Sequence, residues 1–165
     1  MKYMSEKGEK EMSRIKDLQK YVHHVVEGNE KEANQIAHLH GVALAAAILA
    51  KKRGEDAELA TMAGLLHDLY AYKSGSYEDH AHLGADYARK VLKKLEITTD
   101  EETEIICSAI FHHDSKDTVD GEMDEVLKDA DVLHHTLADP TKEVKEHEKA
   151  RYEKLCAELG MKSES

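Results

Sequence analysis

The residues best suited to chemistry form one short run, Ala63 to Leu69, in which a histidine is directly followed by an aspartate. Small and apolar residues surround this His67-Asp68 pair, so both side chains are predicted to be buried. An unpaired buried carboxylate is costly, and such a group normally has a cation or strong donors beside it. A divalent metal would satisfy the imidazole and the carboxylate together. A hydrogen bond between the two side chains near a helix end is the alternative.

Other histidines and aspartates cluster in a similar way along the chain. Seven of the twelve histidines fall between His38 and His113, the part that contains the apolar segments. In order, the clusters are His38 or His40, His67 with Asp68, His80 or His82, His112 or His113, and Asp129 or Asp131. Inward-pointing histidines and carboxylates from several helices are the usual way in which helical bundles hold metals. The joint pattern therefore favours a metal site over a set of satisfied polar core residues.

Apolar residues recur at helical spacing through most of the chain, which predicts the elements that must position these clusters. The predicted helices cover residues 11–27, 30–53, 56–70, 78–95, 101–113, 123–138 and 142–159. The second is apolar all round at its centre and ends at Gly54, so it is predicted to be the buried spine. Thr99 is predicted to cap the fifth helix, with Glu102 in its first turn. We expect an all-α, single-domain bundle of about six to seven helices over residues 11–160, after a flexible N-terminus of residues 1–10.

Composition narrows the functional classes. The chain has 165 residues, one proline, one phenylalanine and no tryptophan, with a formal net charge of −11. This charge argues against binding long nucleic acid through a basic face, but a small phosphorylated substrate remains compatible because bound cations supply local positive charge.

No run of about 18 uninterrupted apolar residues predicts a membrane span, and the charged N-terminus is unlike a signal peptide. Cys107 and Cys156 lack the spacing of a redox or metal motif, so we expect reduced thiols in a cytoplasmic protein. The sequence leaves open whether the protein forms a homodimer.

The motifs resemble those of the HD-domain metal-dependent phosphohydrolases over about residues 37–133. The family pattern is a histidine, a His-Asp pair and a distant aspartate on a helical bundle. His38-Leu39-His40-Gly41-Val42-Ala43 matches the first element in a register that selects His38, and His67 follows twenty-nine residues later. Asp129-Ala130-Asp131 resembles the last element, whose aspartate is Asp131. The resemblance implies that His38, His67, Asp68 and Asp131 hold one ion.

Some relatives hold two ions, and this chain has matching elements for the second. His80-Ala81-His82-Leu83-Gly84-Ala85 and the His112-His113 pair resemble them. By that resemblance Asp68 bridges two divalent ions (Mn, Fe, Co, Ni, Mg or Zn), with His80 and His112 on the second ion and His113 close by. Three further histidines, His82, His134 and His135, are expected to support the ligands or to lie at the surface.

One element departs from the family pattern. Many relatives follow His-Asp with Ile-Gly-Lys, whereas this chain has Leu69-Tyr70-Ala71, so Lys73 or Lys116 is the expected substitute for a phosphate-contacting lysine. The Gly-Tyr-Pro element of cyclic-dinucleotide phosphodiesterases is also missing. Tyr70, Tyr72 and Tyr77 lie at this helix end and in the loop that follows, where packing at the solvent edge is favoured over a pocket wall.

The reaction implied by the resemblance is hydrolysis of a phosphate ester of a nucleotide or a similar small metabolite. A metal-activated water would attack phosphorus, and Asp114 or His113 would orient the water or protonate the leaving group. A dinuclear-iron oxygenase and a non-enzymatic metal-binding regulatory module are the two alternatives, because a fold does not by itself determine a reaction.

Overall fold

A computed structural model of the chain describes residues 13–164, and every regular element among them is helical. The elements are α1 (Arg14–Val26), α2 (Glu32–Arg53), α3 (Ala57–Leu66), α4 (Leu69–Ser74), α5 (His80–Leu95), α6 (Asp100–His112), α7 (Glu122–Leu137), the 3-10 turn η1 (Glu146–Glu148) and α8 (Lys149–Leu159). The predicted all-α bundle is confirmed. The predicted flexible segment 1–10 lies outside the described residues, and the domain bounds 11–160 stay a prediction.

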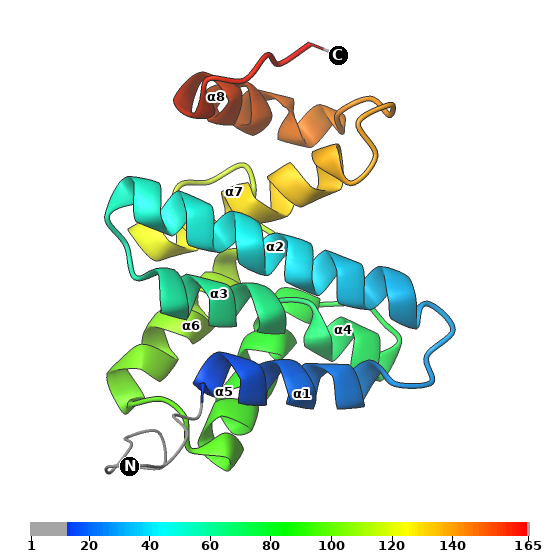
Figure 1. The fold of residues 1–165 in the computed structure, drawn as a ribbon, viewed down its shortest axis with the longest axis vertical. Coiled ribbons are helices and arrows are strands. Elements are labelled where there is room, and N and C mark those ends of the chain that lie inside the picture. The colour runs from blue at the N-terminus through cyan, green and yellow to red at the C-terminus, as the bar shows by residue number, and fades with distance from the viewer. Residues whose placement is uncertain (1–12, 165) are drawn as a thin grey trace.

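Helix α2 is the spine of the bundle, but it is not buried all round as predicted, because Leu44 and Ile48 on one face are 65% and 52% exposed. It crosses the centre of the molecule with α3 along one side and α7 along another (Figure 1). Leu39, Val42, Ala46 and Leu49 are fully buried on it. Gly54 ends the helix with a φ of 75°, a left-handed conformation that glycine adopts without steric cost. By length and composition α2 would also pass for a membrane span, a test that core helices pass as well, and here two helices pack along it.

The His67-Asp68 pair interrupts what the sequence predicted as one helix over residues 56–70. Helix α3 starts at the cap Asp56, whose Oδ1 accepts two main-chain N–H groups, and it ends at Leu66. Asp68 leaves the helical conformation at φ −110° and ψ 3°, and α4 starts again at the next residue. This break accounts for the additional helix, and it turns both side chains of the pair toward the interior.

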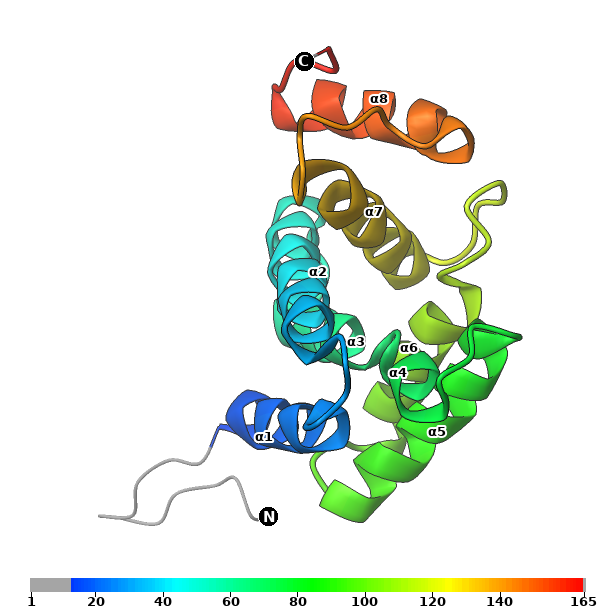
Figure 2. The same cartoon turned by 90° about the vertical axis from the view of Figure 1, so that its right-hand side faces the viewer.

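Helices α5 and α6 pack against each other, and α3 and α4 lie between this pair and α2 (Figure 2). The predicted cap of α6 is confirmed as a capping box. Thr99 Oγ1 accepts from the Glu102 main-chain N–H, and the Glu102 side chain accepts from the Thr99 N–H. The box defines the start of α6, whose last turn carries His112 and leads into the C-cap residue His113.

The C-terminal helix α8 lies over α7 at one end of the molecule (Figure 2). Ion pairs join it to the bundle: Arg151 Nη1 lies 2.9 Å from Asp129 Oδ1, and Glu158 lies 2.7 Å from Arg53 Nη2. The predicted last helix began at residue 142, but residues 143–145 are irregular and α8 starts at Lys149. The connection after α7 is therefore a loop rather than a helix turn.

Candidate metal centre

Two histidines and two aspartates from separate parts of the bundle converge on one point. His38 comes from α2, His67 and Asp68 from the break between α3 and α4, and Asp131 from α7. The Nε2 atoms of His38 and His67 are 3.1 Å apart. Each lies 3.2 Å from Asp68 Oδ2, and they lie 3.3 and 3.4 Å from Asp131 Oδ1. We call these four residues the first ligand group.

The spacing of these atoms fits a shared cation. Ligands about 2.1 Å from a tetrahedral ion lie about 3.4 Å from one another, which agrees with the separations in the first ligand group. Asp131 Oδ1 is buried and has no hydrogen-bond partner among the described residues. A buried carboxylate oxygen in that condition is costly unless a cation or a donor reaches it. Donor type, spacing and the unpartnered oxygen therefore all fit a divalent metal.

A second group shares Asp68 with the first. Asp68 Oδ1 lies 3.5 Å from His80 Nε2 and 3.3 Å from His113 Nε2, and the three residues form a separate set of potential metal ligands. The two oxygens of Asp68 thus face two different groups. A carboxylate in this position is able to bridge two ions, as the resemblance implied. We call Asp68, His80 and His113 the second ligand group.

Main-chain hydrogen bonds orient three of the histidines. His67, His80 and His113 each donate from Nδ1 to the carbonyl oxygen three residues earlier, at 2.7, 2.9 and 2.6 Å. A carbonyl only accepts, so Nδ1 carries the proton in each ring. In the neutral ring, the lone pair is then on Nε2, the atom that faces Asp68. Such outer hydrogen bonds select the tautomer that a metal needs.

His38 is oriented by another histidine. Its Nδ1 lies 2.8 Å from Nδ1 of His134, one helix away on α7. Burial and the neighbouring His38 lower the pKa of His134 to about 4, so this ring is neutral at neutral pH and its Nδ1 is able to accept. The ring fits there because Gly41 has no side chain: a Cβ at this position would lie 2.1 Å from His134 Cδ2.

The carboxylates dominate the electrostatics of the first ligand group. Burial opposes protonation of His67, but Asp68 and Asp131 outweigh it and raise its pKa to about 10. Burial likewise opposes ionisation of Asp131, yet Lys116, whose Nζ is 2.9 Å from Oδ2, helps to hold its pKa well below the usual range. The pKa of Asp68 is also held well below normal, against its burial, chiefly by His67. The group therefore presents two ionised carboxylates that attract positive charge.

The structure differs from the predicted second group at one position. The prediction placed His112 on the second ion, but His113 lies there. Successive residues on a helix point about 100° apart. His112 faces away from Asp68, donates from Nδ1 to the Ser108 carbonyl at 2.8 Å and lies 3.3 Å from Asp124 Oδ2.

Asp129 and Asp131 are two residues apart on α7, so their side chains point about 200° apart. Asp129 makes ion pairs with Arg53 and Arg151 on the α8 side of the helix. Asp131 alone of the two reaches the first ligand group. These positions agree with the register that the resemblance selected, and metal binding itself stays a prediction.

In the pairs His38/His40 and His80/His82, the second histidine points away from the ligand groups. His40 Nε2 lies 2.7 Å from His23 Nε2 on α1, and the His82 ring stacks on Phe111 with centroids 4.1 Å apart. Neither belongs to a ligand group.

A polar cavity of about 400 Å³ opens beside both ligand groups. All of the potential ligands except His67 line it, together with Tyr72, Tyr77, Asp114, His135 and Lys145. Tyr72 and Tyr77 are therefore walls of the cavity, where packing at the solvent edge was predicted. Asp114 therefore lies beside the ligand groups, as the prediction required.

Lys73 does not line the cavity. Its side chain is exposed, and its Nζ lies 4.6 Å from the Tyr87 ring centroid. The assignment of Lys73 to catalysis is not supported by its position, because α4 turns it away from the cavity.

Sequence reasoning missed a support that comes from the C-terminal part of the chain. His135 Nε2 lies 3.3 Å from Asp131 Oδ1, and its Nδ1 lies 3.2 Å from both carboxylate oxygens of Glu148. Glu148 is buried, with 1% of its surface exposed. Neither Glu148 nor Lys145 stands in an apolar or motif-like context, so the sequence carried no local signal for either residue.

A helical bundle with a His, His-Asp and Asp set on its inner faces defines a class of metal-dependent hydrolases. The HD domain family model matches residues 36–136, more than half of the chain. The chain belongs to the HD domain family. Searches of curated proteins and of solved structures give no significant match.

Proposed function

We propose that this protein hydrolyses a phosphate ester of a nucleotide or a similar small metabolite, with divalent ions held by the two ligand groups. The observation that carries the proposal is Asp68, whose two oxygens face separate sets of ligands. Ions bound there would activate a water molecule and neutralise charge on the phosphoryl oxygens. Membership of the HD domain family supports a metal-dependent hydrolase in general. The phosphoester class is our inference.

Residues of the chain would carry out proton transfer and contact the rest of the substrate. His113 has no free nitrogen for proton transfer, since Nδ1 donates to a carbonyl and Nε2 faces Asp68. Asp114 lines the same cavity, is exposed, and belongs to neither ligand group. We therefore assign proton transfer to Asp114. The cavity walls Tyr72 and Tyr77 meet edge to face at 83°, with ring centroids 6.5 Å apart, and they present an aromatic surface to the rest of the substrate.

The test combines metal analysis with turnover. Protein without a histidine tag is analysed for metals, then assayed on nucleoside monophosphates and on p-nitrophenyl mono- and diesters with Mn²⁺, Co²⁺, Ni²⁺ or Mg²⁺. We expect about two ions per chain and metal-dependent release of phosphate or of the alcohol. Asp68→Ala should lose both ions and activity, while His40→Ala, whose ring faces His23, should keep both.

Two results would contradict the proposal. Bound iron with consumption of O₂ and no phosphoester turnover would favour oxygenase chemistry. Bound metal with no turnover of either kind would favour a regulatory module.

A further inference from the structure

The cavity beside the ligand groups contains one lysine that pairs with no carboxylate among residues 13–164. Lys116 lies nearby but is engaged: its Nζ bonds to Asp131 Oδ2 at 2.9 Å, and 6% of its side chain is exposed. Lys73 lies over the Tyr87 ring instead. Lys145 lines the cavity and makes no ion pair with any described residue.

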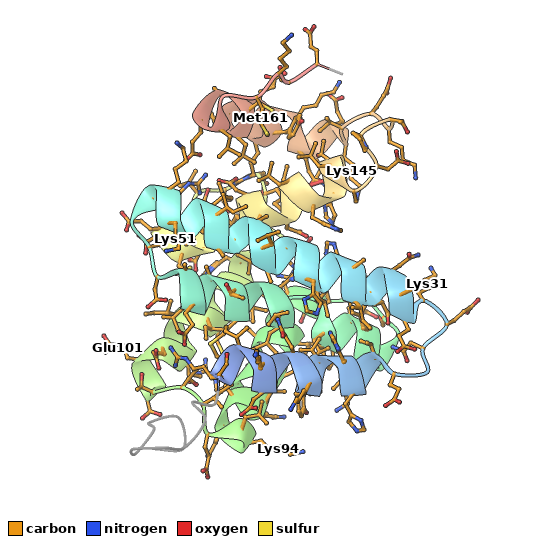
Figure 3. All side chains as sticks on the ribbon, in the orientation of Figure 1. Lys31, Lys51, Lys94, Glu101, Lys145 and Met161 are labelled. Atoms are coloured by element: carbon orange, nitrogen blue, oxygen red, sulfur yellow. The ribbon has the colours of Figure 1, made fainter. Side chains whose placement is uncertain are left out.

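The position of Lys145 is set by its neighbours rather than by a helix. It precedes η1, and its carbonyl accepts from the Glu148 main-chain N–H at 2.9 Å. The Glu148 side chain is buried and lies 3.2 Å from His135, which in turn contacts Asp131. One short segment therefore ties Lys145 to the first ligand group. Figure 3 shows Lys145 in the connection that leads from α7 to α8.

We propose that Lys145 binds the phosphate group of the substrate. This inference rests on the proposed function, because it names the contact that holds the phosphate beside Asp68 and Asp131. A free ammonium on the cavity wall attracts an anion and donates up to three hydrogen bonds to it. The residue lies beyond the segment 36–136 that the family model matches, so the C-terminal part of the chain contributes directly to substrate binding.

The experiment compares Lys145→Met with Lys142→Met in metal-loaded protein. Lys142 is the matched control because it lies in the same connection, is 81% exposed at its side chain and does not line the cavity. Each change removes one positive charge. Binding of inorganic phosphate is measured by calorimetry, and KM and kcat are measured on the best phosphoester. Melting temperatures and metal content verify that each variant folds and loads.

Lys145→Met should weaken phosphate binding about tenfold or more and raise KM by a similar factor, since hydrogen bonds to charged groups are among the stronger ones. Lys142→Met should stay within twofold of the wild type, and Lys145→Arg should recover most of the affinity. Unchanged phosphate affinity in Lys145→Met, or an equal loss in Lys142→Met, would overturn the assignment.

The outcomes also separate this inference from the proposed function. If phosphate binding depends on Lys145 but no phosphoester is hydrolysed, the binding contact stands and the proposed reaction falls. If phosphoesters are hydrolysed with the same KM in Lys145→Met, the reaction stands and the contact falls.

Discussion

Replacing Gly64 by alanine tests how closely the metal centre depends on helix packing. Gly64 lies on α3 where it crosses α2, and its backbone approaches that of Ala43. A Cβ at Gly64 would lie 2.6 Å from Ala43 Cα and 2.7 Å from Ala43 N. Both obstacles are main-chain atoms, so no side-chain rotation relieves the clash. The two helices would have to separate by roughly 1 Å to restore close-packed contact distances.

The energetic cost follows from two opposing terms. Forcing an extra carbon into a packed contact costs about 1–3 kcal/mol, and a rigid backbone obstacle places Gly64→Ala at the upper end. Alanine recovers about 1 kcal/mol of helix propensity. We therefore expect a net loss of roughly 2 kcal/mol. For a chain of this size that corresponds to a fall in melting temperature of roughly 4–8 °C.

Gly84→Ala is the matched control, because it makes the same chemical change inside helix α5. Its Cβ would meet its nearest neighbours at 3.6–3.8 Å, which is ordinary contact. The propensity gain then acts alone, and stability should rise by about 0.5–1 kcal/mol. The two variants should thus shift the melting temperature in opposite directions.

Thermal unfolding of metal-free protein by circular dichroism measures both variants. Metal titration supplies a second measurement, because α2 carries His38 and the Gly64 carbonyl orients His67. Separating the helices should therefore weaken metal binding about tenfold, which is the smaller of the losses expected when the hydrogen bonds that orient metal ligands are disturbed. If Gly64→Ala is as stable as the wild type, or if both variants lose the same stability, the packing argument is wrong.

Three further predictions follow from the site and its surroundings. His113→Ala should bind one ion fewer than the wild type by elemental analysis, and His112→Ala should keep the wild-type number; the reverse would exchange their roles. Saturation with Mn²⁺ at about a hundred times its dissociation constant should stabilise the fold by about 2.7 kcal/mol. That raises the melting temperature by roughly 5–10 °C, and an unchanged melting temperature would exclude a structured site. The hydrogen bond from Arg14 lowers the pKa of Glu102 below its ordinary 4.5, so this carboxylate contributes stability above about pH 4.5 that is lost as the pH falls through its folded pKa. Chemical denaturation between pH 3 and 6 should therefore give a shallower acid dependence for Glu102→Gln, and an identical slope would refute the linkage.

Local patterns were enough to predict most of the architecture. The spine α2, its end at Gly54 and the cap at Thr99 depend on residues within a few positions of one another, and interactions of that range can be read along the chain. The break at Asp68 could not be read in this way. The residues before and after it keep helical spacing, and the interruption depends on how α3 and α4 meet the rest of the bundle.

The sequence by itself determined the fold class, the family and the set of histidines and aspartates from which a metal site is built. The resemblance had already selected His38, His80 and Asp131. Only the tertiary structure decided between His112 and His113, because adjacent helical residues point about 100° apart and the packing of the whole bundle selects the inward direction. This is why His113 lies beside Asp68 where His112 was predicted. It is also why Lys145 and Glu148 reach the site from beyond the motif-bearing segment: contacts between distant segments form only when α8 folds back over α7.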